Sequence, residues 1–171
     1  MEGLRDYALI NLMVRTGLRT IEIARAQVRD LRQDGGEAVL WIQGKGRQAK
    51  DEFVLLVNEA LNPLREYLAA RGEPDQESPL FSSLSDRNAG GPLTTRSIRG
   101  IVKKALRRVN LNDRRLSAHS LRHTAISLSI KGGASLEQAQ AMARHTDPKT
   151  TLIYFHNAAR IEKGAERFIE F

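Results

Sequence analysis

Apolar residues recur along most of this chain with the periodicity of helices. Leu4–Val14 is apolar enough for a buried helix that Gly17 ends, and Thr20 can cap a second helix running to about Val28. Caps and stops predict five more helices: Asn58 to about Ala70, Thr94 or Thr95 to about Val109, Ser120–Lys131, Ser135 to about Ala143, and a short helix that begins at Asp147-Pro148 and carries Tyr154. The tail, Ala158–Phe171, is also predicted to be helical, with an apolar face formed by Ile161, Ala165, Phe168 and Ile169.

One region follows the pattern of strands instead. Glu37–Gln43 and Glu52–Val57 are rich in β-forming residues, and the glycine-containing turn 44–50 between them predicts a hairpin with Lys45 near its tip. The most linker-like stretch, Gly72–Pro79, is short and predicts a loop within one domain. The predicted fold class is therefore α+β, mostly α-helical, with a small antiparallel hairpin or sheet at one edge.

Composition narrows the class of protein. The chain has 171 residues, 41% of them hydrophobic, which is enough for one well-filled core. It has no cysteine, which excludes a disulfide framework and a cysteine nucleophile and suits a reducing cytoplasm. Neither a signal-peptide block nor an apolar span of about 18 residues is present. We expect a soluble protein that remains in the cytoplasm.

Positive charge points to a polyanionic partner. Lys and Arg number 27 against 20 Asp and Glu, a formal net charge of +7. On the predicted helix 95–109, one face carries a basic stripe that no acid interrupts, made of Arg96, Arg99, Lys103 and Arg107. We predict that this stripe contacts the phosphates of double-stranded DNA. The alternative is an ordinary basic protein whose helix needs a solvated polar face.

Six polar side chains lie at or near the ends of predicted elements, where functional groups can converge: Arg19, Lys45, His119, Arg122, His145 and Tyr154. Taken singly, His119 could be a cap or packed histidine and Arg122 a surface ion-pair partner. His119 and His123 also fit a zinc pair, but no further ligand follows at a recognisable spacing, so we expect no metal. Tyr7 and Tyr67 lie in apolar patterns and are predicted core or boundary residues.

Together these residues lie in four motifs that resemble the signature boxes of tyrosine recombinases, the phage integrase family. The motifs are Thr-Gly-Leu-Arg (16–19) with Glu22 one turn later, Gly-Lys-Gly (44–46), His-Ser-Leu-Arg-His-Thr (119–124) and Ala-Arg-His-Thr-Asp-Pro-Lys-Thr-Thr-Leu-Ile-Tyr (143–154). They occur in family order over nearly the whole chain. One departure is that the family usually has Leu-Gly before the second histidine, where this chain has Ala143-Arg144.

The resemblance implies a fold, a reaction and a role for each residue. Residues 1–171 would be a single catalytic domain, without the N-terminal helical DNA-binding domain that such enzymes use to clamp DNA. The implied catalytic set is the arginine pair Arg19 and Arg122, the hairpin lysine Lys45, the histidines His119 and His145, and the nucleophile Tyr154. The implied reaction is site-specific DNA recombination in a prokaryote, phage or mobile element, through a 3′-phosphotyrosine and without a cofactor.

This residue set suits phosphoryl transfer without metal. Two guanidiniums can clamp the equatorial oxygens of a phosphorane, and a tyrosine needs a base, for which His119 is the hypothesis. The resemblance assigns Lys45 as the acid that protonates the leaving 5′-oxygen and His145 as a donor to a nonbridging oxygen. Glu22 is expected to hold Arg19 or a neighbouring backbone group, the alternative being a solvated acid on a helix.

Three functions remain open at this point. The first is a recombinase, monomeric in isolation and tetrameric on two duplexes, with 158–171 docking on its own protomer or packing between protomers. The second is a type IB topoisomerase-like enzyme, which would relax supercoils as a monomer. The third is a noncatalytic DNA-binding module, which covalent trapping on DNA would separate from both enzymes.

Overall fold

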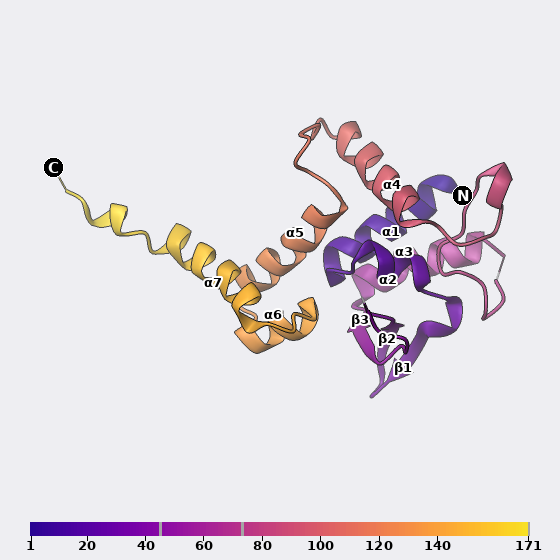
Figure 1. The fold of residues 1–171 in the computed structure, drawn as a ribbon, viewed down its shortest axis with the longest axis horizontal. Helices are drawn as coiled ribbons and strands as arrows, with labels where there is room; N and C mark the ends of the chain where they lie inside the picture. The colour runs from indigo at the N-terminus through magenta and orange to yellow at the C-terminus, as the bar shows by residue number, and fades with distance from the viewer. Residues whose placement is uncertain (45, 73, 171) are drawn as a thin grey trace.

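A computed structural model of the chain describes residues 1–44, 46–72 and 74–170, in which one small sheet lies at the edge of a group of helices (Figure 1). The elements, in chain order, are α1 (Glu2–Thr16), α2 (Thr20–Arg25), β1 (Leu31–Asp34), β2 (Glu37–Ile42), β3 (Glu52–Leu55), α3 (Asn58–Ala70), α4 (Thr95–Arg108), α5 (Ala118–Lys131), α6 (Leu136–Ala143) and α7 (Pro148–Glu162). The predicted class, α+β and mostly helical, is confirmed. In the described ranges no helix is both long and apolar enough to cross a membrane.

The sheet has three antiparallel strands in the order β1-β2-β3, one more than the predicted hairpin. β1 pairs Leu31 with Leu40, and the turn between β1 and β2 is Gly35-Gly36, both at positive φ. Such a two-residue turn matches the twist of a hairpin and favours glycine. The polarity of β1 explains why its strand pattern was missed, since its three later residues are exposed.

The core lies between α1, α3, α4 and the inner face of the sheet. Leu9, Leu12 and Met13 of α1 are fully buried, together with Leu40 of β2 and Ile98 of α4. Burial of such side chains is the main source of stability in a domain of this size.

The two tyrosines predicted as core or boundary residues differ. Tyr67 is fully buried, stacks on Phe81 at 5.6 Å between ring centroids, and accepts the Ser82 backbone N–H at 3.1 Å. That part of the prediction is confirmed. The prediction for Tyr7 was wrong, because its side chain is 60% exposed on the outer face of α1.

The C-terminal helices depart most from the prediction. α5, α6 and α7 pack together, and α7 then leads away from the rest of the molecule (Figure 1). The predicted short helix runs on to Glu162 because no breaker precedes Gly164. After Gly164 only a 3-10 turn forms at Ala165–Phe168, so the predicted helix over 158–171 was wrong in its second half; Phe171 lies outside the described residues.

Candidate active site

Arg19 lies at the turn between α1 and α2, as predicted. Gly17 ends α1 in the left-handed conformation with φ 65°, and a Cβ there would lie 3.8 Å from Cγ of Arg122. Arg19 is the N-cap residue of α2, and its Nη1 donates to Oε1 of Glu22 at 2.8 Å. Its Nη2 donates to the backbone oxygen of Arg144 at 3.4 Å. The turn therefore aims the first arginine at the end of α6.

Arg122 reaches the same place from α5. Its Nη1 donates to the backbone oxygen of Gly17 at 2.6 Å and its Nη2 to the backbone oxygen of Ala143. Arg19 and Arg122 therefore bind consecutive carbonyls at the end of α6. The structure brings the predicted arginine pair together, although the two residues are 103 positions apart in sequence.

Burial and like charge act on this pair. The Arg122 side chain is almost completely buried, and that burial, with the nearby guanidiniums of Arg19 and Arg144, lowers the pKa of Arg122 to about 10. Arg122 still carries its charge at neutral pH. The arginine pair therefore forms a fixed positive site between the α1–α2 turn and the end of α6.

Glu22 is the acid within this positive cluster. It is fully buried, accepts the Arg19 backbone N–H at 2.6 Å, and accepts Nη2 of Arg144 at 2.9 Å. Glu22 thus holds both the side chain and the backbone of Arg19, and the alternative of a solvated helix acid is wrong. Buried charges persist in this way only when they are paired and hydrogen-bonded.

Tyr154 projects from α7 toward α5. Asp147 caps α7 by accepting the Lys149 backbone N–H at 2.9 Å, and Pro148 begins the helix, as predicted. The Tyr154 hydroxyl is hydrogen-bonded to Nδ1 of His123, whose ring lies 5.5 Å away between centroids. Partial burial raises the pKa of Tyr154, while the charge of Arg122 acts in the opposite direction. The phenol is therefore protonated at neutral pH.

Two more histidines lie near His123 and Tyr154. The His119 ring meets the His123 ring edge-on at 4.5 Å, and the His145 ring lies 6.5 Å from the Tyr154 ring. His145 Nδ1 is hydrogen-bonded to Thr151 Oγ1 at 2.9 Å, which fixes the ring against α7. Burial, followed by the charge of Arg122, lowers the pKa of His145 to about 4; burial and the neighbouring His123 lower the pKa of His119. Both rings are neutral at neutral pH.

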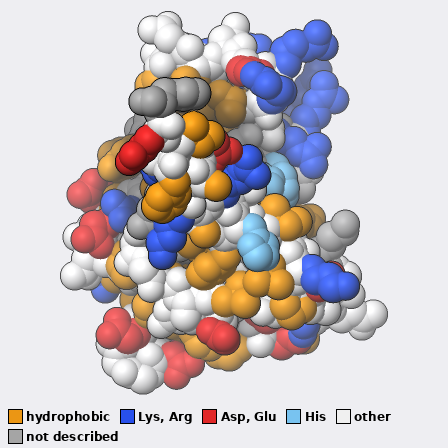
Figure 2. All heavy atoms as spheres, turned by 90° about the vertical axis from the view of Figure 1, so that its left-hand side faces the viewer, with side chains coloured by type: hydrophobic (Ala, Val, Ile, Leu, Met, Phe, Trp, Pro, Cys, Tyr) orange, Lys and Arg blue, Asp and Glu red, His pale blue; other side chains and the backbone are white. Residues whose placement is uncertain are grey.

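The remaining predicted residues are placed less simply. Lys45 lies outside the described residues. On α4, Arg96, Arg99 and Arg107 are exposed, whereas Nζ of Lys103 donates to the backbone oxygens of Asp113 and Leu116 at 2.6 and 2.8 Å. Lys103 therefore ties down the loop between α4 and α5. Figure 2 shows Lys and Arg side chains gathered along one edge of the face that it views.

Two residues of the site were not predicted. His123 was considered only as part of a zinc pair, although its place next to Arg122 in the third motif was a usable signal. Arg144 was noted only as a departure from the family motif. In the described part of the chain, no group of three or more His, Cys, Asp or Glu side chains is arranged to hold a metal ion.

Comparisons with known proteins agree with the motifs. Residues 1–160 match the model of the phage integrase family. A tyrosine recombinase of Synechococcus elongatus is 32% identical over 154 residues, which are 90% of this chain and 47% of that protein. Tyrosine recombinase XerC of Pelobacter propionicus is 34% identical over 154 residues, which are 90% of this chain and 48% of that protein. The chain thus spans about half the length of these relatives.

Solved structures agree as well. The XerH site-specific recombinase, in a post-cleavage complex with its palindromic difH substrate, superposes with a TM-score of 0.78 at 26% identity over 98% of this chain and 46% of that chain. XerA recombinase has the same fold, with a TM-score of 0.76 at 24% identity over 98% of this chain and 58% of that chain. By its motifs, its fold and the family match over residues 1–160, the chain belongs to the phage integrase family, the tyrosine recombinases.

Proposed function

We propose that this chain is the catalytic domain of a site-specific recombinase that cleaves and rejoins double-stranded DNA through a 3′-phosphotyrosine intermediate. One observation carries the proposal: the Tyr154 hydroxyl, on α7, bonds His123 on α5, next in sequence to the buried guanidinium of Arg122. A phenol, imidazoles and two arginines then converge from distant parts of the chain. The names of the relatives, and the difH substrate in the XerH structure, support the same reaction.

In the proposed cleavage step, Tyr154 attacks the scissile phosphorus and the bond to the 5′-oxygen breaks. Arg19 and Arg122 would neutralise the nonbridging oxygens, because each guanidinium has five N–H donors and uses only two or fewer on backbone carbonyls here. His145 would donate to a nonbridging oxygen, and Lys45 would protonate the leaving 5′-oxygen. Rejoining reverses these transfers with the 5′-hydroxyl of another strand, which needs neither ATP nor metal.

The contact at the hydroxyl refines the choice of base. His119 was the base expected from the sequence, whereas the hydrogen bond of Tyr154 supports His123 as the group that first accepts the proton. His119 lies edge-on behind His123 and would orient it or relay the proton.

The assembly that we propose is a tetramer on two duplexes, formed by protomers that are monomeric without DNA. Its support is the end of the chain, where α7 leads away from the other helices and Ile161, Phe168 and Ile169 are all more than half exposed. Such apolar side chains on an extended segment suit packing on a neighbouring protomer. The DNA substrate would place the enzyme in the cytoplasm, at the nucleoid.

A nicked suicide substrate tests the proposed reaction. The full-length protein should form a covalent protein–DNA adduct on a denaturing gel, in the presence of EDTA, and Tyr154→Phe should form none. Tyr7→Phe is the matched control and should form the adduct normally, since Tyr7 is exposed on α1. No adduct from the unmodified protein would indicate a noncatalytic module, and relaxation of a supercoiled plasmid by the monomer would indicate a topoisomerase-like enzyme.

A further inference from the structure

Arg144 adopts a backbone conformation that disfavours most side chains. It is the C-cap residue of α6, in the left-handed region with φ 51° and ψ 48°. Glycine adopts this conformation without steric cost, whereas a residue with a Cβ does not. The Arg144 side chain is nevertheless 96% buried, since its relative exposure is 4%. Strain in the backbone combined with a buried charge indicates that this side chain has a specific role.

The contacts of Arg144 lead to the anchors of both catalytic arginines. Its Nη2 donates to Oε2 of Glu22 at 2.9 Å, and the other oxygen of Glu22 accepts Nη1 of Arg19. The same Nη2 lies 3.4 Å from the backbone oxygen of Gly17, which also accepts Nη1 of Arg122 at 2.6 Å. One side chain therefore touches the group that orients Arg19 and the group that orients Arg122.

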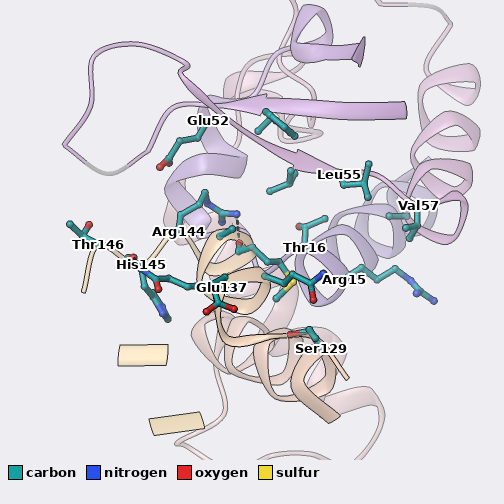
Figure 3. Close-up of a pocket in the computed structure, with 18 of the residues that line it drawn as sticks. Arg15, Thr16, Glu52, Leu55, Val57, Ser129, Glu137, Arg144, His145 and Thr146 are labelled. Atoms are coloured by element: carbon teal, nitrogen blue, oxygen red, sulfur yellow. Dashed lines mark hydrogen bonds between the residues drawn. The ribbon is translucent and has the colours of Figure 1, made fainter. Parts of the chain in front are cut away.

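The remaining contacts fix Arg144 itself. Nη1 donates to the backbone oxygen of Met142 at 2.6 Å, so the guanidinium folds back onto its own helix. Figure 3 shows the side chain between Thr16 and Glu52, on the wall of a groove of about 1100 Å³, with His145 next to it in the chain. Its charge is thus held within the protein, in an ion pair with Glu22.

We propose that Arg144 is a positioning residue of the cleavage site: through Glu22 and the Gly17 carbonyl it sets the guanidiniums of Arg19 and Arg122, and its charge adds to the positive potential at the scissile phosphate. This inference rests on the proposed function. A misplacement of catalytic groups by about 1 Å can cost about 100-fold in rate, so loss of this side chain should slow cleavage strongly.

The test is single-turnover cleavage of the suicide substrate by Arg144→Gly, which also removes the backbone strain. We expect cleavage to slow by at least about tenfold at a temperature at which the variant is fully folded, with a duplex affinity close to that of the unmodified protein. Asn110→Gly is the matched control, because Asn110 is the other non-glycine residue at positive φ in the described chain and is exposed after α4. It should cleave at the normal rate.

A second substrate separates positioning from a structural role. A methylphosphonate at the scissile position lacks one negative charge, so its cleavage depends less on Arg19 and Arg122. Arg144→Lys, which keeps the charge and most of the bulk, serves as the test variant if Arg144→Gly does not fold. We expect it to cleave the phosphodiester more slowly but to approach the normal rate on the methylphosphonate. Equal defects on both substrates, or a normal rate for Arg144→Gly, would overturn the proposal. Absence of any adduct from the unmodified protein would instead reject the proposed function.

Discussion

Removal of the Glu22 carboxylate should destabilise the protein more than removal of any exposed acid. Glu22 is fully buried and accepts three hydrogen bonds, two from Arg19 and one from Arg144. Glu22→Ala would leave the buried Arg144 guanidinium without its counter-ion, beside Arg122. Loss of one partner of a buried ion pair typically costs about 3–5 kcal/mol, because the other charge stays buried and unpaired.

The expected change is large enough to measure in a thermal melt. A domain of this size loses about 2–4 °C of melting temperature for each kcal/mol, so the shift should be roughly 6–20 °C. Glu166→Ala is the control, because the ion pair between Arg160 and Glu166 is exposed on both sides and should contribute little. Circular dichroism at neutral pH measures both variants.

A further variant, Glu22→Gln, separates the effect of Glu22 on cleavage from its effect on stability. Glu22→Gln keeps the size of the side chain but replaces one of its two accepting oxygens with an NH2 donor, so Arg19 should lose its orientation. We expect a loss of cleavage even at temperatures at which this variant is fully folded. If Glu22→Ala melts within a degree or so of Glu166→Ala, the buried network does not stabilise the fold and this reasoning fails.

Three further perturbations test the site and the DNA surface. His123→Gln should slow cleavage about 100-fold or more if His123 accepts the Tyr154 proton, whereas His156→Gln, an exposed residue on α7, should not; equal rates would reject that role. Because the pKa of His145 is lowered to about 4 in the folded protein, the unfolded chain takes up this proton at a higher pH than the folded chain does. The free energy of unfolding should therefore fall as pH drops from about 6.5 toward about 4, and His145→Gln should show a shallower fall. Neutralising Arg96 and Arg99 together should weaken binding to all duplexes and reduce the salt slope by about 2, and an unchanged slope would remove α4 from the interface.

Local signals predicted the helices well because each depends on a few neighbouring residues. Thr94 accepts the Ser97 N–H, and Ser135 forms a capping box with Gln138, as the sequence predicted. β1 was missed because its residues are mostly polar and it is held by pairing with β2 rather than by an apolar face. Secondary structure that depends on a partner strand is not visible in a local pattern.

The sequence motifs predicted most residues of the site, but not the hydrogen bonds that connect them. The motifs indicated Arg19, Arg122, His145 and Tyr154, yet no spacing in the sequence shows that both arginines bind consecutive carbonyls at the end of α6. For the same reason the role of Arg144 was not predicted, because an arginine just after a helix is usually a surface residue. Only the fold shows that its side chain turns inward to Glu22.

The balance of charge at this site explains why it suits a phosphate. Three guanidiniums, of Arg19, Arg122 and Arg144, meet around one buried carboxylate, Glu22, and the two neighbouring guanidiniums each lower the pKa of Arg122. The folded protein therefore carries unbalanced positive charge beside the Tyr154 hydroxyl. A scissile phosphate placed there would reduce this repulsion, and the additional negative charge of a phosphorane would reduce it further. Under the proposed function, the site would be more complementary to the transition state than to the bound diester, which is the electrostatic condition for catalysis.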